Sequence, residues 1–316
     1  MANEHIQAFV QAQKKTYEKC LHGDLTCGGK PVNAHSIQNA NVLKRIHTGG
    51  DVLMPGFRLA NGEPKLDFLK IGRNDASTFT GLCSKHDTEL FKAIDTEPLD
   101  VDNCNHLQQL AYRSVMRELH THLLNGEKFW RIHENSCKAD GLDPNETPTE
   151  PFVRYLHCND KAREVLNYRN RHFDLLLSEG KLPDLWHFVI TMDDQAPVLA
   201  ASAFFSVDFS TDGDIIGPML NVVPLSENRS VAVISCPAWQ MFEVRRALCD
   251  LFDADEKTLK YELAKLIIQR VENFVLSPAH VEKWSDGKKA RVLREFEANL
   301  EKPHQIDDHE DLNIFV

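Results

Sequence analysis

Four residues with the chemistry of metal ligands lie in two separated pairs within the first 90 positions of the chain. Cys20 and Cys27 enclose a glycine-containing turn, and Cys83 and His86 form a Cys-x-x-His pair that opens an expected helix after Gly81. Three thiolates and one imidazole suit a tetrahedral zinc ion. The spacing therefore predicts a zinc site, and the alternative is that these residues are ordinary members of a buried core.

A fifth residue, His35, lies between the two pairs in the tripeptide Ala34-His35-Ser36. A neutral imidazole near pH 7 accepts a proton from water, so His35 is a candidate general base. It is equally a candidate zinc ligand in place of Cys20 or Cys27, and the sequence does not choose between these roles.

The order of these residues resembles the HNH endonucleases, which carry a zinc-bound treble clef (ββα-metal) module. The resemblance covers about 70 residues and rests on the cysteine turn, on His35-Ser36-Ile37 and on Leu82-Cys83-Ser84-Lys85-His86-Asp87. It implies that His35 is the general base and that Cys20, Cys27, Cys83 and His86 bind a structural Zn²⁺. It also implies that Asp87 helps to hold a catalytic Mg²⁺ or Mn²⁺.

The chain departs from the family pattern at three places. Ala34 stands where the family has a metal-binding aspartate, and Asn33 or Ser36 are the residues that could replace it. His86 stands where the family has a cysteine. The family asparagine has no clear counterpart, and the residues nearest its position are Asn74, Ser77 and Thr78.

Two functions follow from the resemblance and its departures. The first is a metal-dependent endonuclease of the HNH type, for which DNA rather than RNA is the expected nucleic acid, with a role in defence against foreign DNA. The second is a catalytically inactive structural zinc protein that serves as a binding or regulatory module. The missing aspartate favours the second function, whereas His35 and Asp87 favour the first.

The charge of the chain is unevenly distributed. The net charge is −11, which argues against a surface that binds nucleic acid over its whole extent. Residues 1–95 nevertheless carry 12 Lys or Arg against 10 Asp or Glu, whereas the remainder carries 24 against 37. This basic part holds the candidates for phosphate contact: Lys30, Lys44, Arg45 and Arg73.

The composition bounds the class of protein. The longest apolar runs fall short of the ~20 residues that a membrane span needs, and the first residues lack the apolar core of a signal peptide. We therefore expect a cytoplasmic protein without membrane contact. The phosphate loop, the dinucleotide fingerprint, the serine-hydrolase elbow and the H-E-x-x-H motif are all absent from the sequence.

The predicted fold class is α+β, with a zinc module over residues 1–100 and a helix-rich domain with a small antiparallel sheet over residues 101–316. A proline-containing linker is expected near residues 135–151. The second domain is expected to serve sensing or assembly, through a protein partner or a second copy of the chain. Hydrophobic periodicity predicts helices at residues 3–19, 37–46, 84–93, 105–124, 150–178, 238–252, 256–274 and 278–300.

The predicted strands follow from β-branched runs bounded by turn residues, at 186–192, 198–209, 215–223 and 231–236. Residues 51–74 are rich in Gly, Pro and Asn, which favours a loop with strand fragments. The last 14 residues, PHQIDDHEDLNIFV, are expected to form an acidic, mobile tail.

Overall fold

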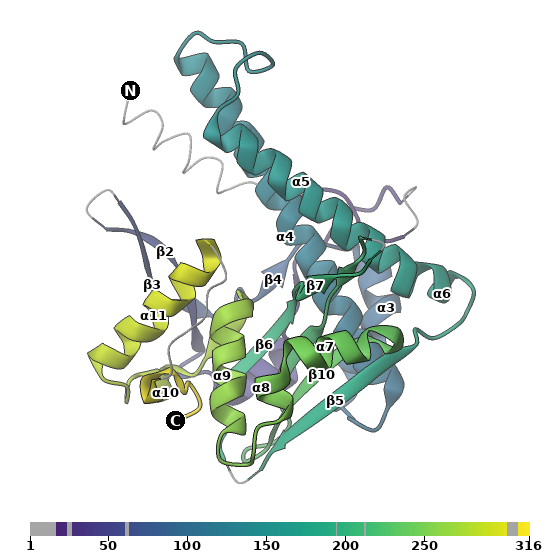
Figure 1. Ribbon diagram of the computed structural model, residues 1–316, viewed down its shortest axis with the longest axis vertical. Coiled ribbons are helices and arrows are strands. Elements are labelled where there is room, and N and C mark those ends of the chain that lie inside the picture. Colours follow the sequence, from purple (N-terminus) through teal and green to yellow (C-terminus); the bar gives the residue numbers. More distant parts are fainter. Residues whose placement is uncertain (1–16, 24–26, 61–62, 194, 212, 302–308) are drawn as a thin grey trace. The chain divides into compact units, whose positions relative to one another are not determined.

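The computed structural model describes residues 17–23, 27–60, 63–193, 195–211, 213–301 and 309–316 (Figure 1). The predicted helix at residues 3–19 falls almost wholly outside this part of the chain. The chain forms two compact units of interleaved segments. Unit 1 comprises the residues up to Ala34, Phe79–Leu90 and Val115–Leu182, and unit 2 comprises His35–Thr78, Phe91–Ser114 and Pro183–Val316. The expected functional division near residue 100 stays a prediction.

The elements follow one another in an α+β order, which confirms the predicted fold class. The helices of the first half are η1 (Asn39–Leu43), α2 (Lys44–Ile46), α3 (Ser84–Thr96), α4 (Cys104–Ala139), α5 (Glu150–Arg169), η2 (Asn170–Asp174) and α6 (Leu175–Ser178). Those of the second half are η3 (Ala238–Gln240), α7 (Met241–Ala247), α8 (Cys249–Phe252), α9 (Leu259–Arg270), α10 (Pro278–Val281), α11 (Asp286–Glu301) and η4 (Glu310–Leu312).

Three sheets are formed by the strands of the described residues. The strands are β1 (Ala34–His35), β2 (Asp51–Ala60), β3 (Glu63–Gly72), β4 (Thr78–Phe79), β5 (Leu185–Met192), β6 (Leu199–Phe204), β7 (Asp208–Phe209), β8 (Ile215–Ile216), β9 (Met219–Pro224), β10 (Ser230–Pro237) and β11 (Phe274–Leu276). Strands β1 and β4 form one pair, and β7 and β8 form another.

The main sheet lies in unit 2 and has seven strands in the order β3-β2-β11-β6-β9-β10-β5. All of its strand pairs are antiparallel. The central strands β6, β9 and β10 are buried along their whole length, so both faces of the sheet are covered. This explains why their sequences are continuous apolar runs rather than alternating ones.

Different elements cover the two faces of this sheet. One face packs against apolar residues of α9 and α11, such as Leu263, Ile267 and Phe296 (Figure 1). The other face packs against η1, α2 and the start of α4, through residues such as Leu43 and Leu107. Alternate residues of each central strand point to opposite cores, which is the expected period of a strand.

The prediction for residues 51–74 was wrong, because these residues form the long strands β2 and β3. Their pairing runs from Asp51↔Gly72 to Ala60↔Glu63. The overlooked signal in the sequence is Asn61-Gly62, a dipeptide typical of tight hairpin turns. The glycine- and proline-based interpretation as a loop did not weigh this dipeptide against the apolar residues on either side.

The expectation of a mobile tail was also wrong for the end of the chain. Leu312, Ile314 and Phe315 are at most 4% exposed and belong to the core of unit 2. Lys288 donates hydrogen bonds to the carbonyl oxygens of Asn313 and Val316, at 2.7 and 2.6 Å. The acidic residues that precede this apolar segment had suggested a solvated tail, but the apolar residues themselves determine where it lies.

In unit 1, the part of α4 from Val115 onward packs against α5. A Cβ atom at Gly126 of α4 would lie 3.6 Å from the Cβ atom of Cys158 on α5. The segment between the helices, within the predicted linker, is held by the buried His133. Its ring nitrogens bond the Thr149 hydroxyl and the Pro144 carbonyl, each at 2.8 Å. Thr149 also caps α5 by accepting a hydrogen bond from the Phe152 N–H.

Candidate metal centre

Unit 1 brings together the four residues predicted as metal ligands. One ligand atom from each of Cys20, Cys27, Cys83 and His86 lies within 4.8 Å of the other three. The Nδ1 atom of His86 is 3.4 Å from the Cys20 Sγ and 3.5 Å from the Cys83 Sγ. The Cys27 and Cys83 sulfurs are 3.9 Å apart. This Cys3His group could hold a metal ion such as zinc.

Three of the six ligand-to-ligand distances match those of a tetrahedral zinc site, and all six are at most 4.8 Å. With bonds of about 2.3 Å to sulfur and 2.0 Å to nitrogen, tetrahedral angles place two sulfurs about 3.8 Å apart and a sulfur and a nitrogen about 3.5 Å apart. The 3.9 Å S···S and the 3.4 and 3.5 Å S···N distances lie within 0.2 Å of these values. A disulfide would require sulfurs near 2.0 Å, so Cys27 and Cys83 are not covalently bonded.

Two backbone segments position the ligands. Cys83 immediately precedes α3, and His86 lies in the first turn of that helix. The turn that carries Cys20 and Cys27 is fixed to the strand-like segment before Cys83 by backbone hydrogen bonds. The N–H of Leu21 donates to the Gly81 carbonyl and that of Val32 to the Leu82 carbonyl, both at 2.8 Å.

Gly29 allows these two segments to approach. A Cβ atom at this position would lie 2.8 Å from the Cβ and 3.1 Å from the Sγ of Cys83. The neighbouring Gly28 has open space, because a Cβ atom there would meet nothing within 4 Å. The requirement for glycine is therefore specific to position 29.

Backbone N–H groups point at the ligand sulfurs. The Cys83 N–H donates to the Cys20 Sγ at 3.3 Å, and the Gly29 N–H donates to the Cys27 Sγ at 3.4 Å. The pKa of the Cys83 thiol is lowered, chiefly because the His86 N–H at the start of α3 donates to its sulfur. Burial raises the pKa of the Cys20 thiol.

A second set of residues supports the ligands in unit 1. The ring of His22 stacks on that of His86, with centroids 3.7 Å apart and an interplanar angle of 15°. The buried Arg169 of α5 donates to the Leu21 carbonyl, and its Nε donates to Asp174 at 2.8 Å. These contacts tie the residue next to Cys20 to α5 and restrict the motion of the turn.

His35 is not one of the residues in the cysteine-histidine group. It lies in β1, half-buried, and its Nε2 is 3.1 Å from the carbonyl oxygen of Arg73. A carbonyl oxygen only accepts, so this hydrogen bond requires a proton on Nε2, and in the neutral ring it leaves the lone pair on Nδ1. Asp87 lies half-buried in the first turn of α3, where its N–H donates to the Cys83 carbonyl.

The residues considered as replacements for the missing family positions have other partners. Ser36 donates to the Ser77 carbonyl at 2.8 Å and accepts from the Asn273 Nδ2 at 3.0 Å. The Ser77 hydroxyl bonds the backbone of residue 37, and Asn74 accepts from Asn39 at 2.8 Å. Asn33 is exposed. Asn33 and Ser36 were the two candidates to replace the missing aspartate. The hydroxyl of Ser36 is used in hydrogen bonds inside the core.

The four candidate phosphate-contacting cations reach solvent. Lys30, Lys44 and Arg45 are exposed and Arg73 is half-buried. By contrast, the buried Arg113 holds a bidentate ion pair with Asp95, at 2.8 and 2.6 Å. Exposed cations of this kind are available to an anionic ligand.

Sequence reasoning missed one arrangement of titratable groups in unit 1. His122 of α4 forms an ion pair with Glu118 at 3.0 Å and a hydrogen bond with the Cys158 thiol of α5. Burial opposes the charged form, but Cys158 and Glu118 outweigh it and raise the pKa of His122 to about 9. The spacing of Glu118 and His122 is the i, i+4 spacing of a helical ion pair, which the sequence does show, whereas Cys158 is distant in sequence.

Comparison of the chain with protein-family models, with curated proteins and with solved structures found no match. The HNH resemblance therefore rests on the quoted residues alone. In the part of the chain that the structure describes, no helix is both long enough and apolar enough to span a membrane.

Proposed function

We propose that the chain is a zinc-stabilised, metal-dependent endonuclease of the HNH type whose nucleic acid is DNA rather than RNA and which takes part in defence against foreign DNA. The observation that carries this proposal is the hydrogen bond from the His35 Nε2 to the Arg73 carbonyl, at 3.1 Å. It fixes the tautomer in which Nδ1 is free to accept a proton from water.

In the proposed reaction, His35 takes a proton from the water that attacks the phosphodiester. Asp87 supplies a carboxylate ligand for a divalent cation, and the exposed Asn33 is the remaining candidate for a second oxygen ligand. A bound Mg²⁺ or Mn²⁺ would supply stabilisation of the charge on the leaving oxygen. The exposed Lys30 would contact the phosphate backbone.

The Cys3His group has a structural role in this proposal. The fit of its ligand distances to a tetrahedral ion supports a treble-clef arrangement with Zn²⁺. The cysteine turn and the start of α3 would be held together by Cys20, Cys27, Cys83 and His86. Loss of one ligand would then impair the fold of the module rather than the chemical step itself.

A second candidate function is a structural zinc protein without nuclease activity, which binds a protein partner or a second copy of itself. One observation favours it. Ala34 offers no metal ligand, and Ser36, the nearest replacement, has its hydroxyl engaged with Ser77 and Asn273 inside unit 2.

A cleavage assay in the presence of Mg²⁺ or Mn²⁺ distinguishes the two proposed functions. Its substrates are plasmid DNA, linear duplex DNA, single-stranded DNA and RNA. The nuclease proposal predicts cation-dependent cleavage that falls at least 100-fold in His35→Ala while zinc content is unchanged. His47→Ala serves as a control, because the His47 ring accepts a hydrogen bond from the Gly50 N–H nearby and has no role in the proposed reaction. Activity that survives in His35→Ala would refute the role of His35, and intact zinc without cleavage of any substrate would favour the second function.

A further inference from the structure

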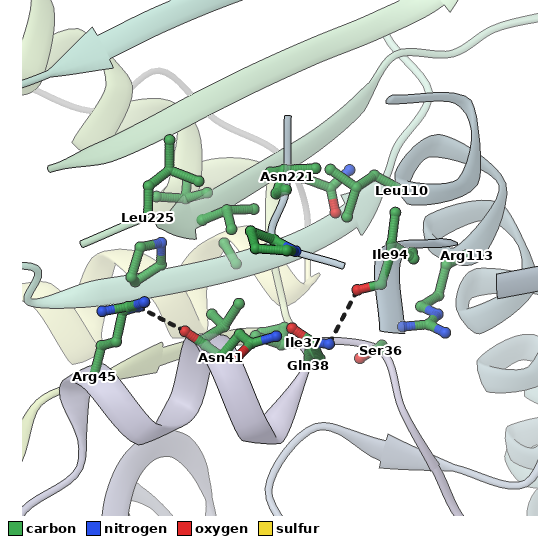
Figure 2. Close-up of a pocket in the computed structure, with 17 residues that line it drawn as sticks. Ser36, Ile37, Gln38, Asn41, Arg45, Ile94, Leu110, Arg113, Asn221 and Leu225 are labelled. Atoms are coloured by element: carbon green, nitrogen blue, oxygen red, sulfur yellow. Dashed lines mark hydrogen bonds between the residues drawn. The ribbon is translucent and has the colours of Figure 1, made fainter. Parts of the chain in front are cut away.

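Unit 2 contains a pocket on the sheet face that is covered by η1, and this pocket is separate from the cysteine-histidine group (Figure 2). Its cavity volume is about 110 Å³, and its mouth is open to solvent. The apolar part of the lining comes from Ile37, Val42, Ile94, Leu99, Leu110 and Val223.

A buried amide without a full set of partners lines this pocket. Asn221 lies in the central strand β9 and is 2% exposed. Its Oδ1 accepts a hydrogen bond from the Ser114 hydroxyl at 3.2 Å, whereas its Nδ2 has no partner among the described residues. A buried donor left unpaired costs about 1–3 kcal/mol. Because less than 1 Å² of the Nδ2 atom is accessible, an acceptor must enter the buried end of the pocket to pair with it.

Gln38 offers the complementary group. Its Nε2 donates to the carbonyl oxygens of Ile94 and Asp95, both at 3.0 Å. These bonds hold the side-chain amide in place. Its Oε1 is left as an acceptor, since no described residue donates to it. An Asn donor and a Gln acceptor beside apolar walls are the groups that recognise the edge of a nucleobase.

A cation lies at one side of the same pocket. Arg45 is exposed, and its Nε donates to the Asn41 carbonyl at 2.8 Å. In Figure 2, Arg45, Asn41 and Gln38 lie along one side of the pocket and Asn221 lies on the opposite side. Arg113 also lines the pocket, but Asp95 neutralises its charge. Arg45 is therefore the cation that remains to meet an anionic group.

The local backbone also has an unusual form. Asn41 and Val42 line the pocket from η1, which is a single π-helical turn over Asn39–Leu43. Such turns are rare and are often found at functional sites, because they displace side chains from the α-helical register.

We infer that this pocket binds a mononucleotide, with the base between the apolar walls, an acceptor on its edge facing the Asn221 amide and the phosphate facing Arg45. The inference concerns unit 2 alone and does not require the proposed nuclease activity. A nucleoside monophosphate combines the planar apolar ring, the hydrogen-bonding edge and the single anionic group that these residues would recognise.

Isothermal titration calorimetry of the full chain with the four nucleoside 5′-monophosphates, adenosine and inorganic phosphate tests the inference. At least one nucleotide should bind with a Kd of about 1–100 μM, and phosphate alone should bind far more weakly. Arg45→Ala should weaken the nucleotide at least 10-fold. Lys44→Ala, which alters an adjacent exposed cation outside the pocket, should change it less than 2-fold.

Asn221→Leu, which is close in shape, should weaken both the nucleotide and the nucleoside at least 10-fold. Should that variant fail to fold, the comparison of Arg45→Ala with Lys44→Ala decides the question. His35→Ala should bind the nucleotide normally, which separates this pocket from the proposed nuclease site. Absence of binding by all four nucleotides at about 1 mM, or equal weakening by both cation variants, would overturn the inference.

Discussion

A methyl group added at Gly29 should weaken metal binding without removing any ligand. The added Cβ would lie 2.8 Å from the Cβ of Cys83, whereas ordinary contact begins at 3.4 Å. The cysteine turn must therefore retreat by about 0.6 Å, which is three times the ~0.2 Å tolerance of a metal site. Changes of this kind around the ligands typically cost 10–100-fold in affinity, so we expect a loss of about 1.4–2.7 kcal/mol in zinc binding.

The assay is competition for Zn²⁺ between the protein and a chromophoric chelator, on wild type, Gly29→Ala and Gly28→Ala. The Gly28→Ala variant is a matched control, since it adds the same methyl group one residue away where there is no neighbour within 4 Å. It should bind zinc within about 2-fold of wild type. Equal zinc affinity in the two variants would refute the geometry deduced for the cysteine turn.

Three further perturbations test the packing and electrostatics of the chain. Phe315→Ala should lower the free energy of unfolding by about 3–5 kcal/mol in urea titrations, because the side chain is 4% exposed, whereas Val316→Ala, at 64% exposed, should cost less than about 0.5 kcal/mol. Burial lowers the pKa of His120 to about 4 from its ordinary 6.5. Between pH 6.5 and pH 4 the unfolded chain therefore binds a proton on His120 that the folded chain does not bind. The free energy of unfolding should fall by about 2–3 kcal/mol over this pH range. The His120→Gln variant should show a smaller dependence of the free energy of unfolding on pH. Asp95→Asn leaves the Arg113 guanidinium, 3% exposed, without its carboxylate and should cost about 2–4 kcal/mol, whereas a loss below about 0.5 kcal/mol would show that the pair is solvated.

The metal ligands could be predicted from sequence because their chemistry is local. Cys83 and His86 lie at the start of a predicted helix, and the glycine-rich sequence around Cys27 predicts a tight turn. Residue type and spacing therefore identified a set that the structure brings together. The general-base role of His35 stays a prediction, but its tautomer could be learned only from the structure, since Arg73 is 38 residues away.

Other parts of the fold depend on pairing between strands, which the amino-acid composition of a segment does not reveal. The hairpin of β2 and β3 contains Pro55 and Gly56, which usually disfavour strands, and its pairing compensates for them. Phe274, the first residue of strand β11, was predicted to end a helix, because short apolar runs suit either structure.

The polar lining of the pocket in unit 2 was hidden for the same reason. Asn221 lies among apolar residues of β9, and nothing in the sequence indicates that Ser114 and Gln38 converge on the same face of the sheet. The role of a buried polar group in a strand depends on its partners in the tertiary structure, which the sequence does not show.

The most direct test of the central claim is the metal content of the purified chain, measured by elemental mass spectrometry on wild type and on Cys83→Ser. The geometry of Cys20, Cys27, Cys83 and His86 predicts about one zinc per chain in wild type and its loss in the variant. Wild-type protein that contains no zinc, and takes up none when Zn²⁺ is supplied, would contradict the claim and return these residues to an ordinary core.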